Sequence, residues 1–398
     1  MKKSLFALSF FAILITILIN VKAVFASSNS SFNISSRATG YEQVHDCAQV
    51  APGFARCLAI TLKPTGIHPA TLATTPAGLT PNDLQNAYHL PSNTAGKGQT
   101  IAIVDAYDDP KAESDLAVYR STFGLPPCTR ANHCFKKVDQ RGNTHYPRAD
   151  AGWAGEIALD LDMVSAIAPH SHILLVEANS DSFNDLGSAV NTAVRLGATE
   201  VSNSYGGQED RSDASALASN YNHRGVAITT SSGDTGYGVQ LPAAFNSVIA
   251  VGGTSLSRAS GTRGWVESAW GGSGSGCSQY VKKPTWQKDS LCHNRTVADV
   301  AAVADPDTGV AVYNSYQSYS NWSIDGGTSA AAPIIAGVYA LAGNAAKVNG
   351  AYLYSHAKDL HDIKDGKNGT CTHSYLCTSN VGYDGPTGLG TPNGTSAF

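Results

Sequence analysis

From about residue 99 onward, short apolar runs alternate with segments in which apolar residues recur at helical spacing. Helical spacing covers residues 113–123 and 185–196. The apolar runs, which are typical of buried strands, cover residues 99–105, 172–177, 201–204, 225–230 and 247–251. Buried strands that alternate with helices of about ten to fifteen residues indicate a parallel sheet covered on both faces. We therefore predict an α/β fold with a doubly wound, mostly parallel central sheet and helices on both faces.

A second pattern begins after a glycine-rich turn at Gly326 and Gly327. Ser329 is followed by apolar residues at helical spacing, namely Ile334, Ile335, Val338 and Leu341. Ser329 is therefore predicted to be the first residue of a buried helix, with Pro333 in its first turn, where proline is tolerated. The N-terminus of a helix stabilises negative charge, so a serine there could act as a nucleophile. An N-cap role is the structural alternative, but Gly327-Thr-Ser-Ala-x-x-Pro333 resembles the serine motif of subtilisin-like peptidases.

The usual base for a nucleophilic serine is histidine, which in subtilisin-like chains opens a His-Gly-Thr helix start. None of the twelve histidines is followed by glycine. In the expected place, residues 155–164 form a helical segment that Pro169 should terminate, and it contains Glu156 and Asp160. Residues four apart lie on one helix face, whereas Asp162 points elsewhere. Two such carboxyl groups raise each other's pKa and can share a proton, and the surrounding apolar residues favour this over an exposed acidic face.

Composition and charge limit the classes of function. The chain has 398 residues and a net charge of −4, and the absence of a basic stripe argues against nucleic-acid binding. Lys2 and Lys3 precede an apolar run over residues 5–21, and small residues around Ala26 suit a signal peptidase. We predict a signal peptide over residues 1–26, a short propeptide-like segment and linker over residues 27–78, and a peptidase domain over residues 79–398. An uncleaved membrane anchor is the alternative for the first run.

Eight cysteines support export to an oxidising compartment. They fall in four short-range pairs by sequence, Cys47 with Cys57, Cys128 with Cys134, Cys277 with Cys292, and Cys371 with Cys377. No two form C-x-x-C, which favours local disulfides over a zinc site, although eight cysteines allow about 105 pairings.

Five motifs in order resemble the sedolisins, the serine-carboxyl peptidase family with a subtilisin-like fold. They are Leu79-Thr-Pro-x-x-Leu84, Glu156-x-x-x-Asp160, Ser232-Gly-Asp234, Trp270 with residues 271–276, and Gly327-Thr-Ser329. The resemblance covers residues 79–398, within which residues 202–207 and 270–276 resemble the family's substrate-binding edges, where glycines would let a substrate's main chain approach as an added strand. It implies that Ser329 is the nucleophile, Glu156 the general base, Asp160 the residue that orients the base and shares its proton, and Asp234 the oxyanion-hole residue.

An oxyanion-hole aspartate has a consequence for pH. A carboxyl group can donate a hydrogen bond only when it is protonated. If Asp234 holds the oxyanion, we expect the enzyme to work best in acid, or burial to raise its pKa. Asp105 ends the first predicted strand but has no histidine partner, so we expect it to support the site rather than to transfer protons. The alternative for Asp234 is an ordinary turn aspartate.

The resemblance also implies one structural Ca²⁺ ion near the C-terminus. Its ligands would be the carboxylates of Asp362 and Asp384 and the main-chain oxygens of Ile363, Asn380 and Gly382, with water completing the shell. Asn380 stands where the family usually has glycine, and the segment before residue 79 is much shorter than the family's folded propeptide.

These observations predict a secreted, monomeric endopeptidase that forms an acyl-enzyme on protein or peptide substrates, without stable membrane association after signal cleavage. Two alternatives stay open. One is a secreted pseudoenzyme that binds peptides without cutting them, which retention of the four catalytic residue types argues against. The other is a hydrolase that uses Asp105 with a distant histidine.

Overall fold

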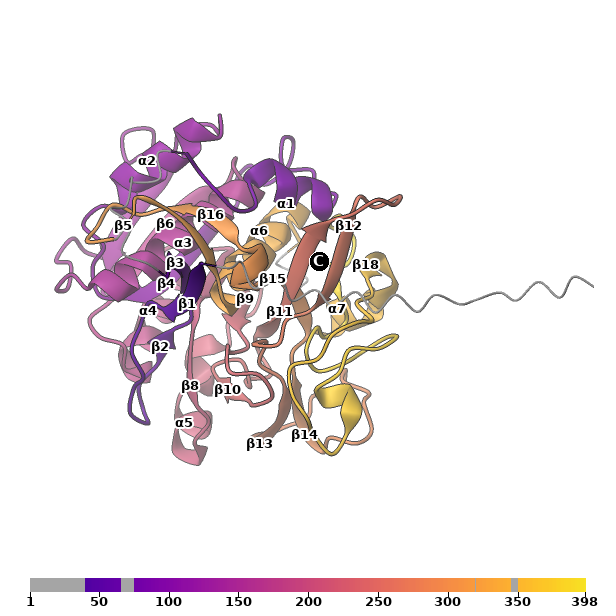
Figure 1. The fold of residues 1–398 in the computed structure, drawn as a ribbon. Coiled ribbons are helices and arrows are strands. Elements are labelled where there is room, and N and C mark those ends of the chain that lie inside the picture. The colour runs from indigo at the N-terminus through magenta and orange to yellow at the C-terminus, as the bar shows by residue number, and fades with distance from the viewer. Residues whose placement is uncertain (1–39, 66–74, 319, 345–349) are drawn as a thin grey trace, which may run out of the picture. The chain divides into compact units, whose positions relative to one another are not determined.

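The computed structural model describes residues 40–65, 75–318, 320–344 and 350–398. Its central sheet has eight strands in the order β12-β11-β9-β7-β4-β6-β5, and β15 also pairs with β11 (Figure 1). Neighbouring strands run parallel except β11 and β12. The strands are β4 (Thr100–Ala106), β5 (Phe135–Asp139), β6 (His172–Ala178), β7 (Glu200–Asn203), β9 (Ala227–Ser231), β11 (Ile249–Arg258), β12 (Trp265–Ala269) and β15 (Val300–Val303). The predicted mostly parallel sheet is confirmed.

Helices cover both faces of this sheet because its strands are apolar on both sides. In β4, Ile101 and Ile103 contribute to one hydrophobic core, whereas Ala102 and Val104 contribute to a second. The first core contains apolar residues of α1, α2, α3 and α6, and the second contains those of α4. The described helices are α1 (Pro81–Ala87), α2 (Ala112–Thr122), α3 (Ala151–Ile167), α4 (Phe183–Arg195), α5 (Arg211–Ala216), α6 (Thr328–Ala342) and α7 (Gly350–Ser355).

The two helices that carry the candidate chemistry lie in the first core. Asp150 caps α3 by accepting hydrogen bonds from the N–H groups of Gly152 and Trp153, both at 3.1 Å, and α3 ends before Pro169 as predicted. α6 begins at Thr328, one residue before the predicted start, so Pro333 lies inside the helix and beyond its first turn. The prediction for Pro333 was therefore wrong. Proline cannot bond the carbonyl oxygen four residues earlier, and that oxygen, on Ser329, instead lies 3.3 Å from Ser204 Oγ.

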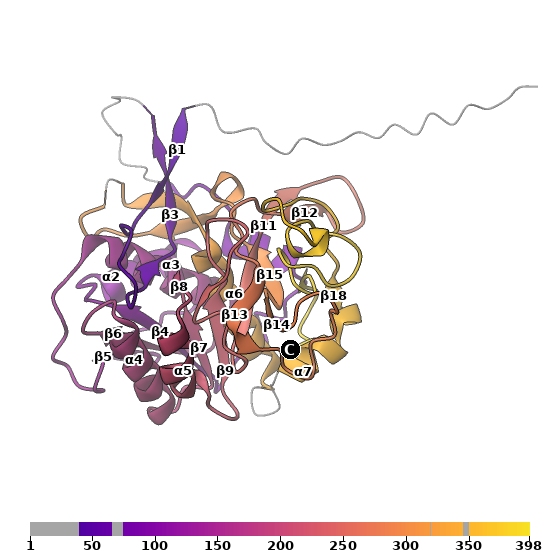
Figure 2. The ribbon, with the colours of Figure 1, turned by 90° about the horizontal axis from the view of Figure 1, so that it is seen from below.

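The segment before residue 65 is joined to the rest of the fold by strands. β3 pairs with β1 on one side and with β17 on the other, and β2 pairs with β8. In Figure 2, β1 and the outer end of β3 extend beyond the helices and the central sheet. These strands are β1 (Tyr41–His45), β2 (Arg56–Cys57), β3 (Ile60–Pro64), β8 (Tyr205–Gln208), β10 (Gln240–Leu241), β16 (Val310–Tyr313) and β17 (Trp322–Gly326). The predicted signal peptide, the Ser- and Asn-rich stretch after it and much of the predicted linker lie outside the described residues.

All four predicted cysteine pairs form disulfides, Cys47–Cys57, Cys128–Cys134, Cys277–Cys292 and Cys371–Cys377. The remaining strands are β13 (Gly276–Lys282), β14 (Asn294–Val297), β18 (Leu360–His361) and β19 (Thr391–Pro392). Within the described ranges, no helix has both the length and the apolar composition needed to cross a bilayer.

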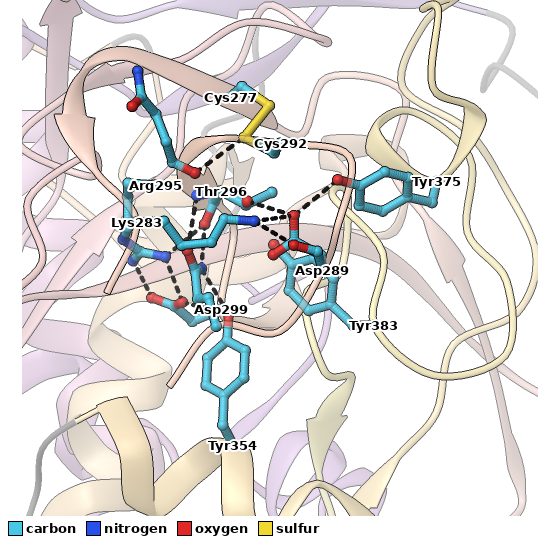
Figure 3. Close-up of polar contacts among 12 residues, drawn as sticks. Cys277, Lys283, Asp289, Cys292, Arg295, Thr296, Asp299, Tyr354, Tyr375 and Tyr383 are labelled. Atoms are coloured by element: carbon cyan, nitrogen blue, oxygen red, sulfur yellow. Dashed lines mark hydrogen bonds and ion pairs between the residues drawn. A yellow bond between two sulfur atoms is a disulfide. The ribbon is translucent and has the colours of Figure 1, made fainter. Parts of the chain in front are cut away.

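A buried polar cluster ties the C-terminal part of the chain to the sheet (Figure 3). Arg295, which is fully buried, donates to Asp299 Oδ1 at 2.7 Å, and Tyr354 Oη donates to the same oxygen at 2.9 Å. The other carboxylate oxygen of Asp299 accepts from the N–H of Ala250 in β11 at 2.9 Å. Removing one partner of such a buried, hydrogen-bonded charge pair is strongly destabilising, so we assign this cluster a structural role.

Candidate active site

The predicted nucleophile and base are in direct contact. Ser329, in the first turn of α6, donates a hydrogen bond from its Oγ to Glu156 Oε2 of α3 at 2.8 Å. Both side chains are fully buried. Neither Ser329 nor Glu156 has a hydrogen bond to a histidine in the part of the chain that the structure describes. The partner of the serine hydroxyl is therefore a carboxyl group.

Asp160 lies one turn after Glu156 and is also fully buried. Its Oδ1 accepts a hydrogen bond from Ser204 Oγ at 2.7 Å. Glu156 Oε1 and Asp160 Oδ2 are both buried, and no donor among the described residues reaches either atom. A proton held by this pair would satisfy these oxygens.

Burial is the main cause that raises the pKa of Glu156 well above its usual range, and the charges of Asp160 and Asp105 raise it further. Burial and Asp105 likewise raise the pKa of Asp160. Hydrogen bonds from Ser329 and from the main chain of Ala59 lower the pKa of Glu156 and so oppose this shift. Glu156 Oε2 accepts hydrogen bonds from Ser329, Leu58 and Ala59, and these bonds stabilise a negative charge on this oxygen.

Asp105, at the end of β4, is a third carboxyl group in this cluster. It is fully buried, neither of its carboxyl oxygens has a partner among the described residues, and burial raises its pKa. A neutral Asp105 leaves Glu156 and Asp160 undisturbed, whereas an ionised one would repel both. The charge of Asp105 raises the pKa of both Glu156 and Asp160, and the sequence analysis expected this residue to support the site rather than to transfer protons.

Asp234 follows β9 and contacts the first residue of α6. Its Oδ1 accepts from the N–H of Thr328 at 2.8 Å and from Thr328 Oγ1 at 2.7 Å. Its Oδ2 is buried and has no partner among the described residues. Burial raises the pKa of Asp234 to about 7, against the opposing effect of hydrogen bonds from Thr328 and the charge of Arg56. The free oxygen can therefore carry a proton and donate it.

Ser204 connects the parts of this site, and sequence reasoning had placed it only in a substrate-binding edge. Its hydroxyl bonds Asp160, and its carbonyl oxygen lies 3.1 Å from Ser329 Oγ. The following strand, β8, was predicted to accept a substrate main chain, and it pairs with residues 56–57 of this chain. The second predicted edge, residues 270–276, contacts the loop at residues 233–238 through bonds such as Gly274 N to Gly233 O at 2.7 Å.

Residues 56–61 cross the site, which the sequence analysis did not foresee. The N–H groups of Leu58 and Ala59 each donate to Glu156 Oε2 at 2.8 Å. The separation of about a hundred residues between these partners leaves no local pattern in the sequence. The one signal available was the apolar run that begins at Cys57.

The predicted calcium ligands lie together near the C-terminus. Asp362 Oδ1 accepts from the N–H of Gly382 at 3.0 Å, and Asp384 Oδ2 accepts from the N–H of Asn380 at 3.1 Å. Two carboxylates therefore bracket one loop. Hydrogen bonds from the described residues do not reach the main-chain oxygens of Ile363, Asn380 and Gly382. This set of oxygen donors fits a hard cation, although no group of three or more His, Cys, Asp or Glu residues in the described ranges is arranged for a metal.

Several known proteins resemble this chain in sequence and in fold. The subtilase family model matches residues 127–359. Kumamolisin of Bacillus sp. (strain MN-32) is 32% identical over 80% of this chain and 63% of its own length. Sedolisin of Pseudomonas sp. (strain 101) is 27% identical over 80% of this chain and 60% of its own length. The chain thus spans about three fifths of the length of these curated relatives.

A solved structure of Pseudomonas sedolisin, a serine-carboxyl proteinase complexed with two molecules of pseudo-iodotyrostatin, matches with a TM-score of 0.68 and 26% identity. The match covers 80% of this chain and 96% of that one, which confirms the subtilisin-like fold. With this family model, the two curated relatives and this structural match, the chain belongs to the subtilase family and, within it, to the sedolisins.

Proposed function

We propose that the protein is a secreted, monomeric serine-type endopeptidase that hydrolyses peptide bonds through an acyl-enzyme, with highest activity in acid. Ser329 attacks the carbonyl carbon, Glu156 takes the hydroxyl proton, and Asp160 orients Glu156 and shares its proton. Asp234, when protonated, donates to the oxyanion. The observation that carries the proposal is the 2.8 Å hydrogen bond from the buried Ser329 hydroxyl to a carboxyl oxygen of Glu156.

The proposed secretion is supported by four disulfides, which persist in oxidising compartments. The proposal also includes a signal peptide over residues 1–26, a domain boundary near residue 79 and a monomeric state.

Digestion of an unfolded protein across a range of pH tests the activity. We expect peptide products in acid, fewer near neutrality, and none with Ser329→Ala. Ser92→Ala is the matched control, because Ser92 is equally buried and has no hydrogen-bond partner among the described residues. A Ser329→Ala protein that still digests the substrate at the wild-type rate would exclude Ser329 as the nucleophile. An unreactive wild-type protein that still binds peptides would favour the pseudoenzyme.

We also propose that Asp362, Ile363, Asn380, Gly382 and Asp384 hold one structural Ca²⁺ ion. Bound calcium would supply positive charge that joins the two carboxylates to the loop at residues 380–384. It takes no part in peptide hydrolysis.

Thermal unfolding with and without a chelator tests the calcium site. A ligand that binds only the folded protein adds about 2.7 kcal/mol of stability at a hundredfold excess over its Kd. We expect calcium to raise the Tm of the wild type and of Asp365→Asn, whose side chain is exposed nearby. Calcium should leave the Tm of Asp384→Asn unchanged. Equal calcium-dependent shifts in all three proteins would place any bound ion elsewhere.

A further inference from the structure

Residues 56–61 are bound across Ser329 as an extended strand. On one side of the serine, Arg56 and Cys57 pair antiparallel with Gly206 and Tyr205 of β8. On the other side, Ile60 and Thr61 pair antiparallel with Gly326 and Asp325 of β17. Main-chain pairing to two edges is how an extended peptide binds by strand addition. The two residues between these pairings, Leu58 and Ala59, therefore lie at the nucleophile.

The carbonyl group of Leu58 points to the oxyanion-hole residue. A Cβ atom added to Gly327 would lie 1.9 Å from the carbonyl oxygen of Leu58 and 2.7 Å from Asp234 Oδ2. Both oxygens therefore meet on the same side of Gly327, which has a φ of 89° and leaves room for them. Asp234 Oδ2 is the buried oxygen that lacks a donor. A proton on this oxygen would face the carbonyl oxygen of Leu58.

The nitrogen of the same peptide bond faces the base. Ala59 N lies 2.8 Å from Glu156 Oε2, the oxygen that accepts the hydrogen bond from Ser329. The N–H of Leu58 also approaches Ser204 O at 3.3 Å, and that oxygen lies 3.1 Å from Ser329 Oγ. The nucleophile, the base and the oxyanion donor thus surround one bond, which is the arrangement required for its cleavage.

We propose that the Leu58–Ala59 bond is the first bond that this protein cuts, within its own chain, and that Leu58 occupies the pocket that selects the residue before the scissile bond. This proposal rests on the proposed peptidase function. It also names the substrate class, which is peptides with leucine before and a small residue after the cleaved bond.

The chemical step balances as an ordinary hydrolysis. Ser329 Oγ bonds to the carbonyl carbon of Leu58 while its proton moves to Glu156, and the negative oxygen is held by Asp234. The C–N bond then breaks, and Ala59 N takes the proton from Glu156 to leave as an amine. Water next attacks the ester between Leu58 and Ser329 and gives a proton to Glu156. The ester bond breaks, the serine oxygen recovers a proton, and the carboxyl group of Leu58 is released.

The side chain of Leu58 supports this specificity. It is 1% exposed, and its Cδ1 lies 3.4 Å from the position that a Cβ atom of Gly206 would take. A Cβ atom at position 206 would be in van der Waals contact with the leucine and would first displace the side chain of Gln240. Ala59, which follows, is fully buried, and a larger side chain there would have to displace its neighbours.

The Cys47–Cys57 disulfide holds this segment in register. Cys57 directly precedes Leu58, and its partner Cys47 follows Asp46, whose N–H donates to Ala59 O at 3.0 Å. Both cysteines precede the proposed cut. Cleavage would therefore separate the part up to Leu58 as one disulfide-closed piece, which still pairs with β3 through β1 and with β8 through β2. The strand β3 would remain covalently joined to the peptidase domain.

The test uses the full-length chain, purified near neutrality and then transferred to acid. We expect a new N-terminus at Ala59, detected by intact mass and N-terminal sequencing, at a rate that does not depend on protein concentration. Ser329→Ala should stay intact. A rate that rises in proportion to concentration would contradict the intramolecular route.

Ala59→Pro removes the N–H that faces Glu156 and should abolish the cut at this position. Ala51→Pro is the matched control, since Ala51 is exposed in the same disulfide-closed loop, and it should be cut like the wild type. Circular dichroism checks that both variants fold. Leu58→Asp, which places a charge on a buried side chain, provides a second variant that should be cut far more slowly.

A reporter peptide with leucine before its scissile bond separates this proposal from the proposed function. The wild-type chain could hydrolyse the reporter while its Leu58–Ala59 bond stays intact, or while it is cut only elsewhere. Either result would overturn the inference and leave the peptidase function standing. A wild type that cuts neither the reporter nor itself would overturn both. Faster hydrolysis of the leucine reporter than of its lysine counterpart, together with the Ala59 terminus, is the expected result.

Discussion

Glu156→Gln is expected to lower kcat/KM for peptide hydrolysis by about 10² to 10⁴. Glutamine has almost the same shape as glutamate, but its amide cannot take the proton of Ser329. The hydroxyl would keep a hydrogen-bonding neighbour at the 2.8 Å position of Glu156 Oε2, so the serine should remain in place. Because the chemical step is affected rather than the fold, the loss should appear in kcat. The measurement is steady-state hydrolysis of a leucine reporter in acid.

The control for this variant is another buried glutamate. Glu200, at the start of β7, is fully buried, and burial raises its pKa to about 8. Glu200→Gln should retain the wild-type kcat. The N-terminus of each variant is sequenced alongside the kinetics, so that a failure of self-cleavage is recorded separately from slow turnover. Equal losses in Glu200→Gln and Glu156→Gln would show that any buried glutamate has this effect.

Asp234→Ala should lose much more peptidase activity than Asp234→Asn. Loss of one oxyanion donor costs about 10² to 10³ in turnover, so we expect Asp234→Ala to be impaired by that factor. An asparagine can keep its oxygen on the two donors of Thr328 and turn its NH₂ group toward the oxyanion. Asp234→Asn should therefore retain much more activity than Asp234→Ala, and equal losses would argue against hydrogen-bond donation by residue 234.

The pH dependence of these variants follows from the protonation of Asp234. Burial raises its pKa to about 7, and only the protonated form donates. Donation is therefore complete well below pH 7 and is lost as the pH rises through the pKa. Asp234→Asn carries its N–H groups at every pH, so its activity should fall less steeply near neutrality than that of the wild type. The pH profiles of kcat for the two proteins provide the comparison.

Local sequence patterns were sufficient for the parts of the site that depend on spacing along one element. Glu156 and Asp160 are four residues apart on α3 and therefore share one face, as the helical spacing predicted. Asp234 follows a strand of the parallel sheet, at the edge where such sheets place their sites. The serine helix was also predicted, because its apolar residues continue for several turns after Ser329.

Interactions between distant segments were not predictable in this way. The bonds from Leu58 and Ala59 to Glu156 join a short strand to a helix that lies far along the chain. A two-residue strand such as β2 has too few positions for a periodic pattern. The position of Pro333 was wrong for a related reason, since the surroundings of the carbonyl oxygen that proline cannot bond come from a distant segment: Ser204 Oγ lies 3.3 Å from Ser329 O.

Covalent labelling of Ser329 tests the central claim, that a carboxyl group activates this serine. Wild-type enzyme and Glu156→Gln are incubated in acid with an activated ester of a leucine peptide, quenched and mapped by mass spectrometry. The expected result is an acyl group on Ser329 of the wild type and much slower labelling of Glu156→Gln. Labelling of both proteins at the same rate, or on another residue, would contradict the claim.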